Sequence, residues 1–301
     1  MKKVIILIST YNGEKYIKEQ IESILLQSYQ EIEIHIRDDG SSDKTVDILK
    51  EYSQKYSAIH VDFGKNVGYP ECFYKLTDKK IDADYFMFSD QDDYWLENKV
   101  ERAVDFLNSE PFDQPVCYYS SYNICDQDLN FIKKSPDKHS QFSLRETLYE
   151  VCGLEFTMAI NKEALNLLKK YKPKTSKARG TWMSMLFSSK GKILYDNVAT
   201  ANYRRHESAV TSSNMSSLGL FLWRIKKFLT NNNSKNYQNM LEEFREIVGN
   251  DLSVQEKKLL SVFCDEHYFF GAFKKIFYPG RLRSSTLDDT QLRILFLLKI
   301  L

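Results

Sequence analysis

Apolar and polar positions alternate along the first ninety residues in a way that predicts four strands and three helices. Residues 4–8 form a continuous apolar run, β-branched except at Leu7, which is typical of a strand buried on both faces. Residues at helical spacing, such as Ile17, Ile21 and Ile24, predict amphipathic helices between the strands. The predicted strands are 4–8, 32–36, 59–63 and 85–88, and the predicted helices are 17–25, 46–52 and 71–77. This βαβαβαβ order predicts an α/β fold, with a mostly parallel sheet covered by helices on both faces.

Polar clusters follow the four predicted strands directly, at residues 9–13, 38–43, 64–68 and 89–93. In open parallel sheets, ligands bind outside the carboxyl ends of the strands. We therefore expect these clusters to line one crevice.

The remaining sequence is less regular and predicts a second, helical region. Residues 97–107 predict a helix, and 116–122, 156–160 and 192–195 predict strands. The pattern becomes helical from about residue 216, with further helices expected near 236–248 and 253–277. We predict one domain over 1–214, with a nucleotide half over about 1–95 and an acceptor half over about 96–214. A helical region follows over 215–301.

Composition and charge narrow the functional classes. The 42 basic and 41 acidic side chains give a net charge of +1, which excludes a protein that coats nucleic acid by bulk electrostatics. The five cysteines form no C-x-x-C pair, which favours a reducing compartment. No segment resembles a cleaved signal peptide or the roughly 20 apolar residues of a spanning helix. The sequence predicts a cytoplasmic protein, or one held at the inner face of a membrane.

The densest chemical signal is the segment Ser89-Asp90-Gln91-Asp92-Asp93-Tyr94-Trp95, which places three carboxylates after a buried strand. Like charges this close repel one another unless a cation or solvent relieves the repulsion. Carboxylate oxygens suit Mg²⁺ or Mn²⁺, ions that commonly bridge carboxylates to phosphates. The alternative is a solvated acidic turn that caps the next helix.

The clusters after the first two strands contain candidate nucleotide contacts. The sequence has neither G-x-x-x-x-G-K-[ST] nor G-x-G-x-x-G, so P-loop and dinucleotide fingerprints are absent. Tyr11 has the ring to stack on a base, and Asp39 has the oxygens to accept from a base N–H. The alternatives are a core aromatic for Tyr11 and a turn-forming aspartate for Asp39.

Three ordered motifs together resemble the family-2 glycosyltransferases of the GT-A fold. They are Ser9-Thr10-Tyr11-Asn12, Arg37-Asp38-Asp39-Gly40-Ser41-Ser42-Asp43 and Asp90-Gln91-Asp92-Asp93, each after a predicted strand. The resemblance covers roughly residues 3–210. The motif Ser-Asp-Gln-Asp-Asp-x-Trp looks most like that of the rhamnosyltransferase-like branch of this family.

The resemblance implies inverting transfer of a sugar from a nucleotide-diphosphate donor, dTDP-rhamnose or a UDP-hexose, in bacterial surface-glycan assembly. It implies that Mn²⁺ or Mg²⁺ neutralises the charge of the leaving diphosphate. By position, the implied donor-binding residues are Ser9, Thr10, Tyr11, Asp39, Asn66, Asp90, Gln91 and Arg204; the implied metal ligands are Asp92 and His206. Trp95 and Trp182 are expected on the acceptor side.

The sequence departs from the branch where the general base is expected. The branch carries an aspartate just before a tryptophan, but here Thr181 precedes Trp182. An inverting transferase usually needs a base on the acceptor hydroxyl. Glu155 is the nearest acidic candidate, and Asp93 and Asp196 are weaker ones; the alternative for Glu155 is a strand-edge glutamate.

Two hypotheses therefore stay open. The first is a metal-dependent glycosyltransferase with a glycan, lipid-linked or protein-linked acceptor. The second is a catalytically impaired nucleotide-sugar-binding or scaffolding partner of a glycosyltransferase complex. Basic residues interleave with aromatics in the segments 220–229 and 269–283, a pattern that suits helices on an anionic membrane. The more common alternatives are helices that pack on the main domain or pair two subunits.

Overall fold

The computed structural model describes residues 1–139, 141–205, 233–264 and 268–298. The chain divides into two compact units. The first contains Met1–Gln141, Gly153–Lys170 and Gly191–Ser208, and the second contains Phe142–Cys152, Tyr171–Lys190 and Ala209–Leu301. The predicted boundary at 214 lies outside the described residues.

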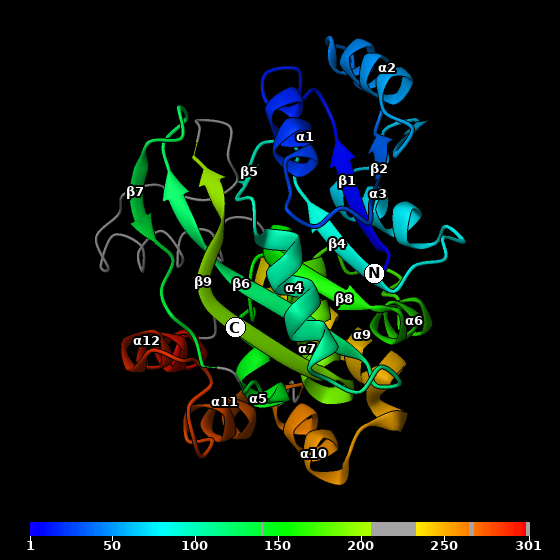
Figure 1. The fold of residues 1–301 in the computed structure, drawn as a ribbon. Coiled ribbons are helices and arrows are strands. Elements are labelled where there is room, and N and C mark those ends of the chain that lie inside the picture. Colours follow the sequence, from blue (N-terminus) through cyan, green and yellow to red (C-terminus); the bar gives the residue numbers. More distant parts are fainter. Residues whose placement is uncertain (140, 206–232, 265–267, 299–301) are drawn as a thin grey trace. The chain divides into compact units, whose positions relative to one another are not determined.

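A single sheet forms the centre of the first unit (Figure 1). The described part of the chain contributes nine strands in the order β3-β2-β1-β4-β8-β6-β9-β5, with β7 paired to β6. The strands are β1 Val4–Thr10, β2 Ile32–Asp38, β3 Ile59–Phe63, β4 Tyr85–Ser89, β5 Tyr94–Trp95, β6 Val116–Cys125, β7 Phe131–Lys134, β8 Met158–Asn161 and β9 Lys192–Arg204. The first four strands pair in parallel, and β8 runs antiparallel between β4 and β6.

Helices cover both faces of this sheet, as the amphipathic patterns predict. They are α1 Ile17–Leu25, α2 Thr45–Lys55, α3 Tyr69–Thr77, α4 Lys99–Asn108 and α6 Lys162–Lys170, with a 3₁₀ turn η1 at Glu155–Thr157. Apolar residues of α1, α2 and α4 share one buried cluster with Val4, Ile6 and Ile8 of β1. Successive strand residues face opposite ways, so Ile5 and Leu7 lie on the other face, where α3 packs on β1 and β2. Burial on both faces explains the continuous apolar run of β1.

The second unit is helical in its described residues. Its elements are α5 Leu144–Thr147, α7 Arg179–Lys190, α9 Asn233–Val248, η2 Gly249–Asp251, α10 Val254–Phe263, α11 Tyr268–Ile276 and α12 Thr286–Leu297. The single helix predicted over 253–277 is thus two helices. Among the helices that the structure describes, none has the length and apolar content to cross a membrane.

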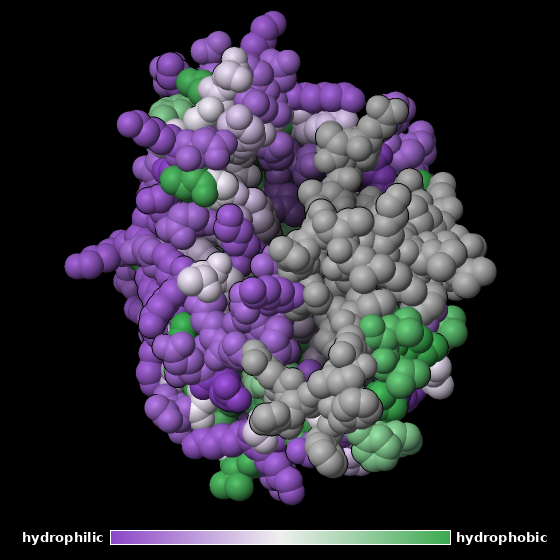
Figure 2. All heavy atoms as spheres, turned by 180° about the vertical axis from the view of Figure 1, so that it is seen from behind, coloured by the Kyte–Doolittle hydropathy of each residue, from purple (hydrophilic) through white to green (hydrophobic). Residues whose placement is uncertain are grey.

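Exposed apolar side chains gather on the C-terminal helices (Figure 2). Phe273 and Phe277 of this region are 63% and 67% exposed, and their ring centroids lie 4.5 Å apart. Lys274, between them in sequence, is also exposed. The predicted helix at 220–229 lies outside the described residues.

Candidate functional site

The polar clusters meet at the carboxyl ends of the parallel strands, as predicted. The register pairs Thr10 at the end of β1 with Asp38 at the end of β2, and Ile8 with Ser89 at the end of β4. Hydrogen bonds then connect the segments that follow these strands. Three loops that are distant in sequence therefore form one edge of the sheet.

Gln91 fixes the loop after β4 to the loop after β1. Its Oε1 accepts from Thr10 Oγ1 at 2.7 Å and from the Tyr11 amide at 2.9 Å, and its Nε2 donates to the Tyr11 carbonyl at 3.3 Å. Gly13 is needed for this approach, because a Cβ there would lie 2.5 Å from Gln91 Oε1. The Tyr11 side chain stays 48% exposed above this fixed backbone, which suits a ring that stacks on a base.

Asp39 fixes the loop after β3 to the end of β2. Its buried carboxylate accepts from the amides of Val67 and Gly68 at 2.8–3.0 Å and from Arg37 Nη2 at 3.4 Å. Gly68 has a φ of +86°, a conformation that glycine adopts without strain. Asn66 is exposed beside these amides. Asp39 therefore organises the loop as well as lying where a base contact is predicted.

The carboxylates of the loop after β4 differ sharply in their surroundings. Asp90 and Asp92 are half-buried, and both make interactions within the protein. Asp93 is buried, and one of its oxygens accepts from the Arg204 amide at 3.3 Å. Burial, reinforced by the charges of Asp90 and Asp92, raises the pKa of Asp93 well above its ordinary value. Of the three carboxyl groups of this loop, Asp93 is thus the buried one whose ionised form its surroundings disfavour.

A buried lysine lies close to Asp93. Burial lowers the pKa of Lys99 to about 7, partly opposed by the charge of Asp93. Lys99 Nζ donates to Thr200 Oγ1 at 3.2 Å and lies 4.8 Å from the centre of the Trp95 ring. Trp95 is only 1% exposed and belongs to the buried cluster of the sheet. The structure thus places Trp95 in the core beneath the acidic loop.

Arg204, at the end of β9, holds the backbone of the acidic loop. Its guanidinium donates to the Asp92 carbonyl at 3.0 Å, to the Gln127 carbonyl at 2.6 Å and to the carboxylate of Glu19. The same group lies 4.6 Å from the centre of the Tyr16 ring. The side chain is 4% exposed, so it positions Asp92 from within the protein. The donor contact implied for Arg204 stays a prediction.

Glu155 lies at the same edge of the sheet as the acidic loop. It begins η1, directly before β8, and β8 runs antiparallel to β4 with Phe86 opposite Ile160 and Met87 opposite Ala159. Residues before β8 therefore lie beside the carboxyl end of β4, and η1 contacts β4. Glu155 is half-buried. Glu155 therefore lies at the end of the sheet that carries the acidic loop, and its role as a base stays a prediction.

Comparison with known proteins identifies the family. The family model for glycosyl transferase family 2 matches residues 5–168, more than half of the chain. The chain belongs to glycosyl transferase family 2. The dTDP-rhamnosyl transferase RfbG of Shigella flexneri is 33% identical to this glycosyltransferase over 221 residues, which cover 69% of this chain and 74% of RfbG.

Another relative and a solved structure extend this comparison. The UDP-Glc:alpha-D-GlcNAc-diphosphoundecaprenol beta-1,3-glucosyltransferase WfaP of Escherichia coli is 28% identical over 223 residues, covering 72% of this chain and 83% of WfaP. The structure of S. aureus TarS 1-349 in complex with UDP-GlcNAc matches with a TM-score of 0.57 at 15% identity, covering 99% of this chain and 92% of that chain. The GT-A fold expected from the sequence motifs is thereby confirmed.

The remaining predicted site residues of this glycosyltransferase are Trp182, Ser9 and His206. Trp182 of α7 is fully buried, where its Nε1 donates to the Tyr171 carbonyl at 2.9 Å and its ring packs edge-on against Phe244. Ser9 is half-buried in β1. His206 lies outside the described residues. The acceptor-side role of Trp182 remains a prediction. Its full burial is also what a residue of the hydrophobic core would show.

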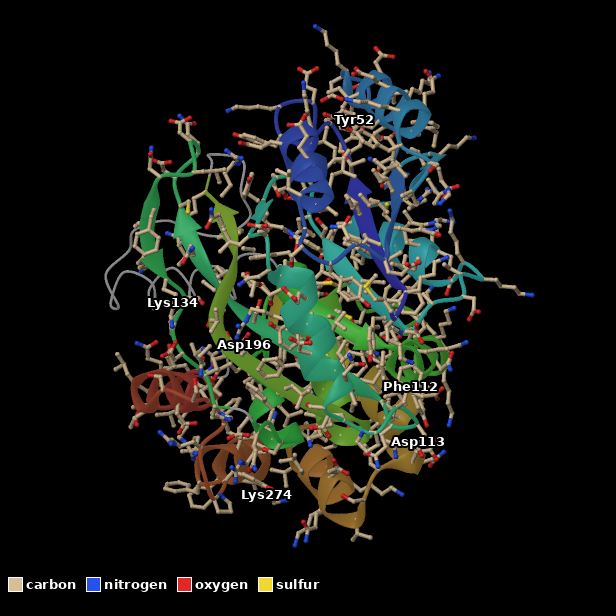
Figure 3. The ribbon with its side chains drawn as sticks, in the orientation of Figure 1. Tyr52, Phe112, Asp113, Lys134, Asp196 and Lys274 are labelled. Atoms are coloured by element: carbon tan, nitrogen blue, oxygen red, sulfur yellow. The ribbon has the colours of Figure 1, made fainter. Side chains whose placement is uncertain are left out.

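Asp196 has a structural role. Its carboxylate accepts from Arg102 Nε at 2.8 Å, from the Tyr118 hydroxyl at 3.1 Å and from the Val198 amide at 2.9 Å. Figure 3 shows it on β9 beside α4. Because its oxygens are used in the core, Asp196 is a poor candidate for the base.

Several residues that build the site are not predicted from the sequence. Gln20 is buried on α1 and donates to Ser89 Oγ at 2.8 Å, and Thr45 Oγ1 accepts from the Gly13 amide at 2.8 Å. Glu19 is likewise unpredicted, although it pairs with Arg204. Gln20 carries a detectable signal, since it is a polar residue beside Ile17, Ile21 and Ile24 on the apolar face of a helix.

Proposed function

We propose that this family-2 glycosyltransferase transfers a hexose from a nucleotide-diphosphate sugar, dTDP-rhamnose or a UDP-hexose, with inversion at the anomeric carbon. The acceptor is a growing glycan of bacterial surface-glycan assembly, carried on lipid or protein. One observation supports this proposal above the others: Gln91 and Asp39 join the ends of four strands beside the exposed Tyr11 and the two acidic side chains Asp90 and Asp92. The dTDP-rhamnosyl transfer that RfbG is named for and the UDP-GlcNAc bound to TarS support the donor classes.

A divalent cation, Mn²⁺ or Mg²⁺, completes the proposed site. The half-buried carboxylates of Asp90 and Asp92 are oxygen donors of the kind that these ions prefer. Asp92 would ligate the ion, and Asp90 would lie near the ribose. His206 would be a further ligand. When bound, the ion supplies charge that stabilises the departing diphosphate.

The protein's own side chains divide the remaining work. Tyr11 stacks on the base and Asp39 accepts from its N–H, while Gln91 keeps both loops in place. Glu155 accepts the proton of the acceptor hydroxyl. Asp93 is unsuited to that step, because its side chain is buried and out of reach of an acceptor hydroxyl. We propose a structural role for Asp93, as a buried residue that supports the acidic loop beneath Asp92.

A donor screen tests the function. The full chain is incubated with Mn²⁺ and each of dTDP-rhamnose, UDP-glucose and UDP-galactose, and nucleotide diphosphate release is measured with a lipid-linked glycan acceptor. One donor should raise Tm and be turned over. Asp92→Ala should reduce turnover by about 100-fold or more, as loss of a transition-state charge contact does. Asp113→Asn is the matched control, because Asp113 is exposed in the loop after α4 (Figure 3). Equal turnover in both variants would contradict the metal assignment.

The second candidate is the catalytically impaired partner. The observation in its favour is Thr181, which occupies the position where the rhamnosyltransferase-like branch has an aspartate, directly before the fully buried Trp182. This candidate predicts a donor-dependent rise in Tm with no diphosphate release from any donor. Glu155→Gln separates the two candidates, since it should abolish release at unchanged donor binding only if the chain is active.

We further propose that the C-terminal helices rest on an anionic membrane. Exposed Phe273 and Phe277 beside Lys274 combine apolar burial with attraction to acidic lipid. The name of WfaP includes a diphosphoundecaprenol acceptor, which is a lipid. Co-sedimentation with vesicles containing phosphatidylglycerol should fall after Phe273→Ser with Phe277→Ser. Unchanged sedimentation and a dimer in solution would favour subunit pairing instead.

A further inference from the structure

Two histidines and a glutamate lie together on the sheet, on the strands β2 and β3. The parallel register places His35 of β2 directly opposite His60 of β3. Glu33 lies two residues before His35 and therefore faces the same side of the sheet. The ring centroids of the two histidines are 4.6 Å apart. This group is separate from the loops at the carboxyl ends of the strands, since His35 lies four residues before Asp39, or about 13 Å along the strand.

His35 is a polar side chain in an environment that leaves it unsatisfied. Its side chain is 12% exposed, and the nearest partner of its Nε2 is Glu33 Oε2 at 3.6 Å, beyond ordinary hydrogen-bond length. Burial, helped by the proximity of His60, lowers the pKa of His35 to about 4. Buried polar atoms without partners are uncommon in folded proteins and call for a physical explanation.

The separations of the candidate ligand atoms match those around a metal ion. Glu33 Oε2 lies 3.6 Å from His35 Nε2 and 3.8 Å from His60 Nε2, and one atom from each residue lies within 4.8 Å of the others. Zinc–ligand bonds of about 2.1 Å at tetrahedral angles separate ligand atoms by about 3.4 Å. Small side-chain rotations are enough to close this difference.

The neighbouring charges also fit such a site. Lys3 Nζ pairs with the other carboxylate oxygen of Glu33 at 2.7 Å, which orients Oε2 toward the imidazoles. Lys79, which adds positive charge near His35, is paired with Asp62. His60 is 48% exposed and gives an ion access from solvent.

We propose that Glu33, His35 and His60 form a binding site for a borderline transition-metal ion, of which Zn²⁺ is the best match. Two imidazoles and one carboxylate are a donor set for Zn²⁺ rather than for Mg²⁺, which prefers oxygen. The bound ion would join β2 to the edge strand β3. Those strands lead into Asp38–Asp39 and the 64–68 loop, so the site would stabilise the donor-binding edge without taking part in the reaction.

Zinc binding by the tag-free, metal-stripped full chain tests this proposal. The protein is titrated with Zn²⁺ in competition with a chromophoric chelator, in an Asp92→Ala background so that the acidic loop does not contribute. One equivalent should bind, and Tm should rise with Zn²⁺. His60→Gln should weaken this binding by more than about tenfold, because even the loss of an outer partner of a metal ligand costs about that much. Co²⁺ in place of Zn²⁺ should give the visible absorption of a nitrogen- and oxygen-ligated ion.

His139→Gln is the matched control, since His139 is exposed elsewhere in the first unit. It should bind Zn²⁺ as the Asp92→Ala parent does. His60→Gln is the leading variant because its exposed side chain makes few packing contacts, and circular dichroism checks its fold. Failure of the parent to bind Zn²⁺, or equal affinities in the two histidine variants, would overturn the proposal.

Discussion

Two carboxylates in this protein hold loops in the same way, yet only one belongs to the candidate site. Asp39 accepts from the amides of Val67 and Gly68 in the first unit. Glu243 of α9 accepts from the amides of Lys174, Thr175 and Ser176 in the second unit, at 2.5–2.9 Å. A carboxylate bonded to successive amides is therefore a means of fixing a loop and does not by itself indicate a ligand site.

The charges around the two carboxylates are what differ. Glu243 borders a cavity of about 600 Å³ whose lining mixes Lys174 and Arg245 with Glu242 and Glu246. Asp39 belongs to a network that ends in Asp90 and Asp92, where charge of one sign is strong enough to help raise the pKa of Asp93. Two basic and three acidic side chains line the cavity, so most of their charge offsets, whereas Asp90 and Asp92 add charge of one sign at the acidic edge. We therefore place the chemistry at the acidic edge.

The largest expected effect concerns the arginine behind that edge. Arg204→Ala removes three side-chain hydrogen bonds from a buried guanidinium and should lower the free energy of unfolding by about 3 kcal/mol or more. Urea denaturation measures the loss. The neighbouring Arg205→Ala should cost much less, because Arg205 is only half-buried. Equal losses in the two variants would show that Arg204 does not support the acidic loop.

Gly13→Ala tests the Gln91 contacts themselves. The added Cβ would lie 2.5 Å from Gln91 Oε1, so Gln91 must move and release Thr10 and Tyr11. Such overpacking costs about 1–3 kcal/mol, and we expect donor affinity to fall by roughly 5- to 100-fold in a thermal-shift titration. Gly249→Ala is matched, since its Cβ would meet only Arg245 Cγ at 3.7 Å. Donor affinity that is equal in both variants would contradict a role for the 9–13 loop.

Tyr11→Ala should produce a smaller change in donor affinity. Stacking of a base on an aromatic ring contributes about 1–3 kcal/mol by alanine substitution, and half-exposed Tyr11 should be at the low end of that range. Tyr11→Phe keeps the ring and should bind donor nearly as the natural protein does. If the phenylalanine variant loses as much affinity as the alanine variant, the ring does not stack.

The smallest effect on the free energy of unfolding is expected for Glu243, the loop-holding carboxylate of the second unit. Burial raises the pKa of Glu243, but hydrogen bonds from Thr175, Lys174 and Ser176 outweigh burial and leave the pKa below its ordinary value. The carboxylate therefore stabilises the fold above its unfolded pKa, and this contribution disappears as the pH falls through the lower folded pKa. Glu243→Gln should cost about 1 kcal/mol at pH 7 and progressively less below about pH 4, with donor binding unchanged. A loss of donor binding would mean that the cavity beside Glu243 is functional.

The parallel core was well predicted from the sequence because burial on both faces gives unbroken apolar runs. The strand predicted at 59–63 matches β3, and the polar clusters meet as expected. The antiparallel insertion of β8 between β4 and β6 was not predictable, since a four-residue buried strand has no period that shows its direction. Strand β5 is shorter still.

The candidate site was only partly predictable for a related reason. Motifs reveal residues that are close in sequence, such as Asp90 and Asp92. The contacts of Arg204 with Asp92 and Glu19 span 112 and 185 positions, and no local pattern encodes them. From the sequence alone, Gly13 is likewise interpreted as a turn residue, because only the structure shows how closely Gln91 approaches it.

Strand β9 has a consequence for how the protein is made. It is the last described strand along the chain, yet β6 and β5 both pair with it, and it carries Arg204 to the acidic loop. At about 5–20 residues per second, a ribosome produces Arg204 roughly 6–20 s after Asp92. During that interval the nascent chain has Asp90, Asp92 and Asp93 without the arginine that fixes them. Donor binding should therefore begin only after residue 204 has left the ribosome, although the motifs that name the family are complete more than a hundred residues earlier.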